Sequence, residues 1–276
     1  NDVDITCTVA PAIIFYNVYE CCSRDAETAT KDVDTTKAGA NVIIADDTKN
    51  NINGSYVAKI YQSYETRADG TEASAGKTLH KYDGAFYSRQ TMNINGGIKG
   101  SGILNITAEN EGLDSELHLT INGGIIHIVS GNDGINTNED QVSVTTINGG
   151  TLDILCSGST GEGDGIDSNG WLVINGGTVY SFGNANSMDS GLDSDMGIYI
   201  NGGTVLATGN MYDEISKEST QNFAVFNFAQ PIYDESVILK SLNDDSLTLL
   251  RGNAKGSVMV YSSPQLTEGE YELYFA

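Results

Sequence analysis

The side chains best suited to chemistry in this sequence are carboxylates that recur at matching positions. Segments of the form Gly-Leu/Ile-Asp/Asn-Ser/Thr begin at residues 112, 134, 165 and 191. Their third residues, and the acids that flank them, include Asp114, Asp133, Asp164, Asp167 and Asp193. Oxygen donors that repeat in this way indicate cation binding, because stacked carboxylates repel one another unless they are protonated or bridged by a cation.

The charge of the surrounding sequence supports this interpretation. The 276 residues carry 14 Lys+Arg against 37 Asp+Glu, a formal net charge of -23, and residues 100–216 contain no Lys or Arg at all. Such a charge excludes nucleic acid as a direct partner. Carboxylates, amides and carbonyls without sulfur or imidazole suit Ca²⁺. The predicted ligands are Asp114, Asp133, Asn136, Glu162, Asp164, Asp167, Asp189, Asp193 and Asp195. The alternative is a solvated acidic face without a specific site.

A sequence repeat defines the elements that must position these acids. Ile-Asn-Gly-Gly begins at residues 94, 121, 147, 174 and 200, in steps of 27, 26, 27 and 26 residues. Short alternating apolar segments lie between these corners, and no helical stretch separates them. A propeller blade needs about 40 residues and four strands. The period therefore predicts an all-β fold, a right-handed parallel β-helix or solenoid, in which the hand follows the usual preference of parallel crossovers.

The same repeat predicts which side chains face inward. Leucine and isoleucine of the three short strands are expected in the core. The asparagines of the corners are expected to stack as an inward ladder, and the corner glycines to adopt left-handed conformations. The ladder residues are Asn95, Asn122, Asn148, Asn175 and Asn201.

The domain organisation follows from where the repeat holds. Residues 1–210 are predicted to form the parallel β-helix, with 1–90 as irregular early rungs and 91–210 as regular repeats. Residues 211–276 alternate like antiparallel strands and are predicted to form a β-rich C-terminal cap. The polar segment from Gln62 to Lys77 is expected to be an exposed loop. No run of 18 apolar residues exists, so no membrane span is expected.

Cysteine and histidine give weaker signals. Cys7 could pair with Cys21 or Cys22 in an extracellular protein, and free thiols are the alternative; the spacing does not fit a zinc site. His118 and His127 are expected to be ordinary surface residues. No nucleophile motif occurs, so no catalytic residue is predicted. Because the chain begins without Met or a leader segment, a signal peptide is expected to have been removed or the chain trimmed.

Several segments together resemble a known family. They are residues 161–171, the repeated Ile-Asn-Gly-Gly-Thr, residues 38–47, residues 82–86 and residues 262–266. They are similar to bacterial secreted carbohydrate-binding proteins of right-handed parallel β-helix fold, which is the pectate-lyase-like fold. The resemblance implies calcium at the acidic corners, a plant cell-wall polysaccharide such as polygalacturonate (pectin) or cellulose as partner, and a secreted or cell-surface bacterial protein.

The same fold and calcium chemistry occur in pectate lyases, so an enzyme is the first alternative. β-Elimination needs a base, typically Lys or Arg, near the calcium. Lys99 and Lys217 border the repeats as the nearest candidates. We therefore expect binding without cleavage, with Tyr180, Phe182 and Tyr199 offering faces for sugar stacking. A cell-surface adhesin or scaffold is the second alternative.

Overall fold

The chain folds entirely into strands and connecting segments. The structure, a computed structural model, describes residues 2–242 and 248–275, and within these ranges it contains β-strands and no helix. The predicted all-β class is confirmed. It follows that none of the described residues forms a helix that could cross a membrane.

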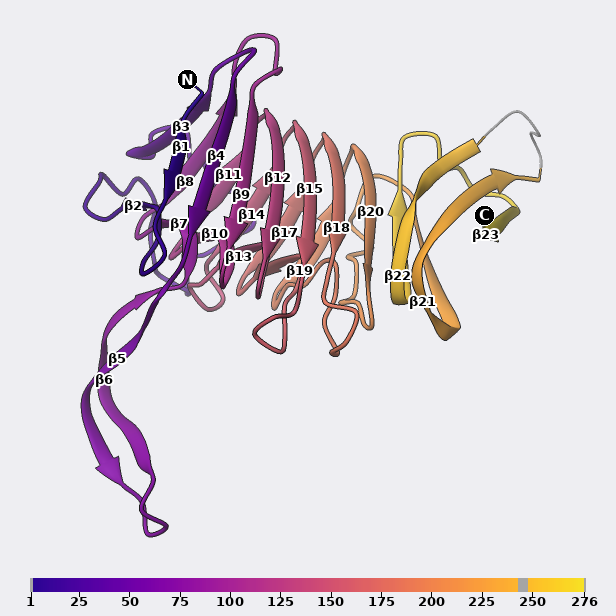
Figure 1. The fold of residues 1–276 in the computed structure, drawn as a ribbon. Coiled ribbons are helices and arrows are strands. Elements are labelled where there is room, and N and C mark those ends of the chain that lie inside the picture. Colours follow the sequence, from indigo (N-terminus) through magenta and orange to yellow (C-terminus); the bar gives the residue numbers. More distant parts are fainter. Residues whose placement is uncertain (1, 243–247, 276) are drawn as a thin grey trace.

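Three sheets carry the repeats, and their short strands lie side by side along the molecule (Figure 1). The five-stranded sheet contains, in spatial order, β16 (Ile166–Ser168), β13 (Ile135–Thr137), β10 (Glu111–Ser115), β7 (Gly84–Ser88) and β2 (Ile13–Phe15). The six-stranded sheet contains β19 (Gly197–Ile200), β17 (Trp171–Ile174), β14 (Val144–Ile147), β11 (Leu119–Ile121), β8 (Met92–Gly96) and β3 (Ala40–Ile44). Every pairing within these two sheets is parallel.

The third sheet has ten strands and changes character along its length. Its order is β1 (Asp4–Thr6), β4 (Lys49–Gly54), β9 (Ile103–Ala108), β12 (Ile125–Ser130), β15 (Thr151–Cys156), β18 (Thr178–Phe182), β20 (Thr204–Gly209), β22 (Thr248–Ser262), β21 (Phe223–Ser241) and β23 (Tyr271–Phe275). Pairings from β1 to β20 are parallel, and those from β20 to β23 are antiparallel. The long strands β21 and β22 therefore extend the sheet beyond the last repeat.

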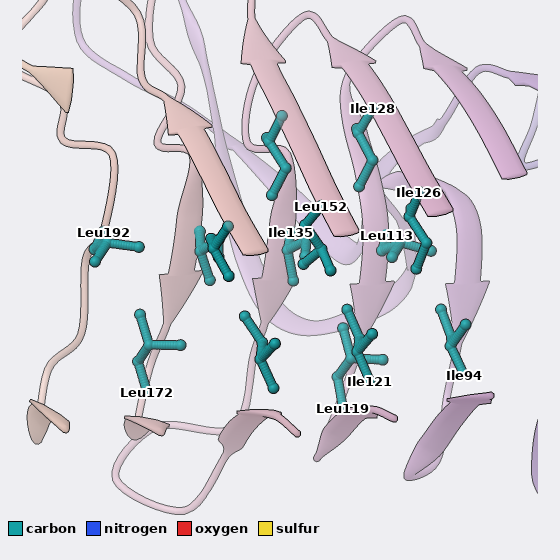
Figure 2. Packing of buried hydrophobic residues seen from close by; sticks show 14 of the residues in the cluster. Ile94, Leu113, Leu119, Ile121, Ile126, Ile128, Ile135, Leu152, Leu172 and Leu192 are labelled. Carbon is teal, nitrogen blue, oxygen red and sulfur yellow. The ribbon is translucent and has the colours of Figure 1, made fainter. Parts of the chain in front are cut away.

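Apolar side chains from all three sheets meet in one core between them (Figure 2). Leu113, Ile121 and Leu152 come from three different sheets and are each fully buried. Their neighbours at alternate positions face outward, as strand geometry requires. Removing such side chains from water is the main term that stabilises the stack.

The asparagine ladder forms, but outside the core. Asn122, Asn148 and Asn175 are exposed, and each donates its side-chain amide to the asparagine of the preceding rung at 2.9 to 3.0 Å. The prediction of an inward ladder is wrong because the isoleucine before each asparagine is fully buried, and alternation turns the next residue outward. The second glycine of four corners adopts positive φ, from 84° at Gly177 to 98° at Gly124.

The segment expected to be a loop is instead a hairpin. β5 (Val57–Thr66) and β6 (Glu72–Tyr82) pair antiparallel and project from the stack (Figure 1). A turn closes the hairpin at Asp69-Gly70, where Gly70 has φ of 84°. Polarity suggested a loop, but Asp-Gly between two segments that can pair is itself a hairpin signal.

A segment without regular structure, residues 19–39, runs along the outside of the six-stranded sheet. The Thr35 and Thr120 hydroxyls bond at 2.8 Å, and Asn93 donates to the Thr35 carbonyl at 2.7 Å. Lys31 places its ammonium 5.2 Å from the centre of the Tyr199 ring. Thr120, which alternation places on the outer face, is buried beneath this covering segment.

Candidate functional site

The acids that recur with the repeat lie along one side of the five-stranded sheet, across its adjacent strands. Asp114 pairs in register with Asn136, Asn136 with Asp167, and the bridge between Ile166 and Leu192 places Asp193 next along. We call this set the acid row; it comprises Glu111, Asp114, Asp133, Asp164, Asp167, Asp193 and Asp195. The spacing of the sequence repeat thus becomes a line of oxygen atoms across adjacent strands.

One end of the acid row, which we call the closed end, is buried around an internal cation. Glu111 and Asp114 are only 4% and 1% exposed. Lys81, from β6 of the hairpin, lies among them, 2.9 Å from the Asp83 carboxylate and 3.4 Å from Asn138. Asp114 accepts hydrogen bonds from the Gly84 amide at 3.2 Å and from the Asn138 side chain at 2.5 Å.

Burial governs protonation at this end. It raises the pKa of Asp114 to about 8, helped by the negative charge of Glu116, while Lys81 acts in the opposite direction. Burial and Asp114 also raise the pKa of Glu111 well above its usual value. Burial lowers the pKa of Lys81, but the charges of Glu111 and Asp83 outweigh this, so its pKa is raised and it stays an ammonium.

In the middle of the row, carboxylates accept hydrogen bonds from main-chain amides of an adjacent rung. Asp133 accepts a hydrogen bond from the Asp164 amide at 2.7 Å, and Asp164 from the Ser190 amide at 2.6 Å. Asp189 accepts from the Gly163 amide at 2.7 Å. Each of these bonds occupies one carboxylate oxygen and leaves the second for another partner. Glu162 is exposed on the same corner.

The other end of the row is partly exposed, and we call it the open end. It consists of Asp167, Asp193 and Asp195 of the row together with Asp213, which lies beyond the last repeat; Asp195 is exposed and the others are half-buried. Burial and neighbouring carboxylates raise the pKa of Asp167 to about 7. Burial and a hydrogen bond with Asp213 raise that of Asp193 to about 9. Both shifts come first from burial and second from the neighbouring carboxylates, since each disfavours the charged form.

A cavity of about 530 Å³ opens at this end of the row. Its lining includes Asp195, Tyr199, Asp213 and Lys217. The structure thus brings together a predicted calcium ligand, a predicted sugar-stacking tyrosine and one of the two lysines that border the repeats. Asp213 was missed because the repeat motif ends near Met211, although parallel bridges continue to Ile215.

Some buried oxygens of the row have unsatisfied acceptor capacity. Among the described residues, Glu111 Oε2, Asn132 Oδ1 and Asn136 Oδ1 are buried without a hydrogen-bond partner. Asn136 donates to the other Glu111 oxygen at 3.2 Å. Acceptor oxygens left unpaired in the interior are costly unless a proton or a cation completes them.

The other predicted sugar-stacking residues lie elsewhere. Tyr180 and Phe182 are half-buried on the ten-stranded sheet, where they pack against the apolar cluster formed with the C-terminal strands around Leu206 and Tyr261. Tyr199 belongs to the six-stranded sheet. The three aromatic residues therefore do not form one platform. Lys99 is also remote from the open end, since it pairs with Asp47 at 2.6 Å.

Of the histidines and cysteines considered in the sequence analysis, His118 departs from the expectation. His127 is partly exposed beside Asp153, but His118 is buried, so the prediction of a surface position is wrong for it. The reason is tertiary: the covering segment lies over His118, whose Nδ1 accepts the Val144 amide at 3.0 Å. All four cysteines are free thiols, and Cys156 is buried.

Comparison with known families assigns the chain. The sequence model of a family described as "Carbohydrate-binding domain-containing protein" matches residues 1–228. The chain belongs to this carbohydrate-binding family. The match covers the five- and six-stranded sheets, the parallel strands of the ten-stranded sheet and the whole acid row, so a carbohydrate-binding role is supported for the part of the chain that contains the cavity. No curated protein and no solved structure matches the chain significantly.

Proposed function

We propose that the chain binds an acidic plant cell-wall polysaccharide of the polygalacturonate (pectin) type without cleaving it, using Ca²⁺ held at the open end of the acid row. The observation that carries this proposal is the cavity lined by Asp195, Tyr199, Asp213 and Lys217 in a member of a carbohydrate-binding family. Tyr199 offers a ring for a sugar face, and Lys217 an ammonium for a uronate carboxylate. Cellulose, which has no carboxylate, is the alternative polymer.

Calcium fits the chemistry of the row. The donors are carboxylate and amide oxygens, which this hard cation prefers, and no sulfur or imidazole competes among the predicted ligands. We propose Asp167, Asp193, Asp195 and Asp213 as the residues that would hold the ion, since Asp193 is hydrogen-bonded to Asp213, Asp195 and Asp213 line one cavity, and the charge of Asp195 acts on Asp167. The weaker candidates for calcium ligands are Asp133, Asp164 and Asp189, because one oxygen of each carboxylate already accepts a hydrogen bond from a main-chain amide.

A bound cation of this kind would also link protein and ligand, since both are negatively charged. The chain has a net charge of -23, and a polyuronate would otherwise be repelled from it. Binding would therefore depend on calcium, and it would grow with polymer length because neighbouring weak contacts act together.

The fold proposed for this function is a right-handed parallel β-helix. Parallel pairing of successive rungs in three sheets supports the helix, and the strong right-handed preference of parallel crossovers supports its hand. We also propose residues 1–210 as the β-helix and 211–276 as the cap. In support, β22 pairs antiparallel with β20, at the end of the parallel series.

A calcium-dependent pectate lyase that acts by β-elimination is the second candidate function, because Lys217 lines the same cavity as Asp195 and Asp213. Binding without cleavage is favoured because residues 100–216 contain no Lys or Arg that could act as the eliminating base, which leaves Lys217 at their border as the basic residue in the lining of this cavity. A surface scaffold or adhesin without glycan affinity is the third. A secreted or cell-surface bacterial location follows from the proposed partner.

The test combines retention on polysaccharide with an assay for cleavage. We expect the chain to be retained by polygalacturonate in Ca²⁺ and released by a chelator, without formation of unsaturated uronate product. Product formation would replace the proposal by the lyase, and lack of retention on both polygalacturonate and cellulose would leave the scaffold. Retention on cellulose that is unchanged by chelator would contradict the role of calcium.

Variants locate the site. Tyr199→Ala and Asp213→Asn are expected to weaken retention at least tenfold, because one removes the stacking ring and the other a calcium ligand. Tyr64→Ala, an exposed tyrosine of β5, is the matched control and should bind normally. If Tyr180→Ala weakened retention at least tenfold and Tyr199→Ala did not, the binding site would lie on the ten-stranded sheet.

A further inference from the structure

The covering segment begins with two adjacent cysteines whose thiols lie together. The sulfur atoms of Cys21 and Cys22 are 3.1 Å apart, and both lie near the Asp34 carbonyl, at 3.9 and 3.7 Å. Among the described residues, Glu20, Cys21 and Cys22 form the one group of three potential metal-ligating side chains whose ligand atoms all lie within 4.8 Å of one another. The acid row, despite its charge, contains no group this compact within the described ranges.

The carboxylate of this group is held in place from two directions. One Glu20 oxygen accepts the Cys22 amide at 3.0 Å, and the other accepts the Thr91 amide at 2.8 Å. Thr91 directly precedes β8, so Glu20 ties the covering segment to the six-stranded sheet. A carboxylate oriented by such bonds is better prepared to bind a metal than a free surface side chain.

A cavity adjoins the two thiols. Its volume is about 240 Å³, and its lining includes Cys21, Cys22, Asp34 and the buried imidazole of His118. The cavity gives a bound ion room for a further ligand, either a water molecule or the His118 imidazole after a side-chain movement. Two sulfurs, one oxygen and an open position form a donor set that zinc-type ions accept.

We propose that Glu20, Cys21 and Cys22 form a binding site for a thiophilic metal ion of the Zn²⁺ class, separate from the oxygen-only acid row. The ion replaces the protons of the two thiols and binds both sulfurs and a Glu20 oxygen. Calcium does not compete, because it prefers oxygen ligands and larger coordination numbers. The site is independent of the proposed glycan binding.

Two other roles for the cysteine pair are less well supported. Burial and a hydrogen bond with Cys21 raise the pKa of Cys22 to about 12, so in the metal-free protein its thiol is protonated and a poor nucleophile, and a metal ion must displace that proton. A disulfide between the two residues would require an external oxidant, and slow thiolate formation disfavours exchange.

A metal at this position would fasten the covering segment to the sheet beneath it. Downstream, the segment is attached through the Thr35–Thr120 and Asn93–Thr35 hydrogen bonds. An ion bound upstream at Cys21 and Cys22 would add a second attachment. Binding only to the folded state raises stability by mass action.

The experiment titrates the reduced 276-residue chain with Zn²⁺, and with Cd²⁺ as a spectroscopic probe, in buffer that contains Ca²⁺. We expect one equivalent to bind, with a sulfur-to-metal charge-transfer band in the ultraviolet for Cd²⁺. The band should disappear in Cys21→Ser/Cys22→Ser and persist in Cys7→Ser, the control at another half-buried cysteine. Glu20→Gln should weaken affinity about tenfold. No band in the parent chain, or a band retained in the double variant, overturns the proposal.

A second measurement avoids reliance on variants that could fold poorly. Alkylation of each cysteine in the parent chain is followed by peptide mass analysis with and without Zn²⁺. We expect Zn²⁺ to slow modification of Cys21 and Cys22 at least tenfold and to leave Cys7 unchanged. Equal rates at Cys21 and Cys22 with and without the metal would contradict the site.

Discussion

The carboxylates at the two ends of the acid row have different partners that can neutralise their charge. At the closed end, Glu111 and Asp114 are almost completely buried, and Lys81 from the hairpin lies among them. At the open end, Asp193, Asp195 and Asp213 meet solvent beside a cavity whose lysine, Lys217, is exposed. The two ends therefore differ in what neutralises the carboxylates.

This comparison indicates which end can exchange its cation. An ammonium on a strand of the chain is permanent and requires no ion from solution. Carboxylates that share a solvent-accessible edge can instead recruit a metal and release it. A ligand that carries its own carboxylates can reach only the second kind of site.

The largest effect is expected from removing the internal cation. Lys81→Met leaves the Asp83 carboxylate, 2.9 Å from the ammonium, without its positive partner and should lower the free energy of unfolding by about 1.5 to 3 kcal/mol, since Glu111 and Asp114 are held largely protonated by burial. Urea denaturation at neutral pH measures this change. Lys99→Met, at an exposed ion pair, is the control and should cost less than about 1 kcal/mol. Equal costs would remove the distinction between the ends.

A pH series without calcium tests whether the carboxylates of the acid row lack compensating positive charge. Asp164, Asp167 and Asp193 have raised pKa values, about 6, 7 and 9, so the folded state holds protons that the unfolded state has lost. Stability from these groups is therefore present at low pH and is lost as pH rises from about 4 towards 9. We expect a loss of about 2 kcal/mol between pH 5 and 8 in chelator, allowing for solvent screening.

Calcium should reduce this dependence, since a bound cation favours the ionised acids. Melting curves with chelator and with Ca²⁺ across the same pH range make the comparison. A metal-free protein that becomes more stable as the pH rises over this range would refute the interpretation of the acid row.

A smaller effect is expected at the open end alone. Asp193→Asn removes one of two hydrogen-bonded acids and should stabilise the calcium-free protein by about 1 kcal/mol at pH 8, because an amide can donate to Asp213. The same change should diminish the stabilisation by Ca²⁺. A variant that is less stable in chelator yet gains as much from Ca²⁺ as the parent would exclude Asp193 from the site.

The smallest effect is expected where the repeated positions are uncharged. Asn148→Ala removes the exposed ladder bonds to Asn122 and Asn175 and should cost about 0.5 to 1 kcal/mol by urea denaturation. Leu152→Ala, in the core of the next strand, should cost about 2 to 5 kcal/mol. If the two costs were similar, the ladder would support the fold more than its exposure indicates.

The sequence was sufficient for the features that a repeat specifies locally. The period of 26 to 27 residues and the alternation of apolar residues predicted the strands and the alignment of Asp114, Asn136 and Asp167, which the parallel register confirms. The inward asparagine ladder was a misreading of the same signal, because the buried isoleucine beside each asparagine already required the amide to face outward.

Only the tertiary structure decided which segments distant in sequence meet the repeats. Lys81 reaches the acid row because the hairpin returns beside the first corner, and Asp213 joins the open end through an additional partial rung. His118 is buried, and the Cys21–Cys22 pair adjoins its cavity, because the covering segment lies across the six-stranded sheet. Periodicity determines neighbours one rung apart, since strand pairing fixes their register, whereas contacts made by non-repeating segments depend on how the whole chain packs.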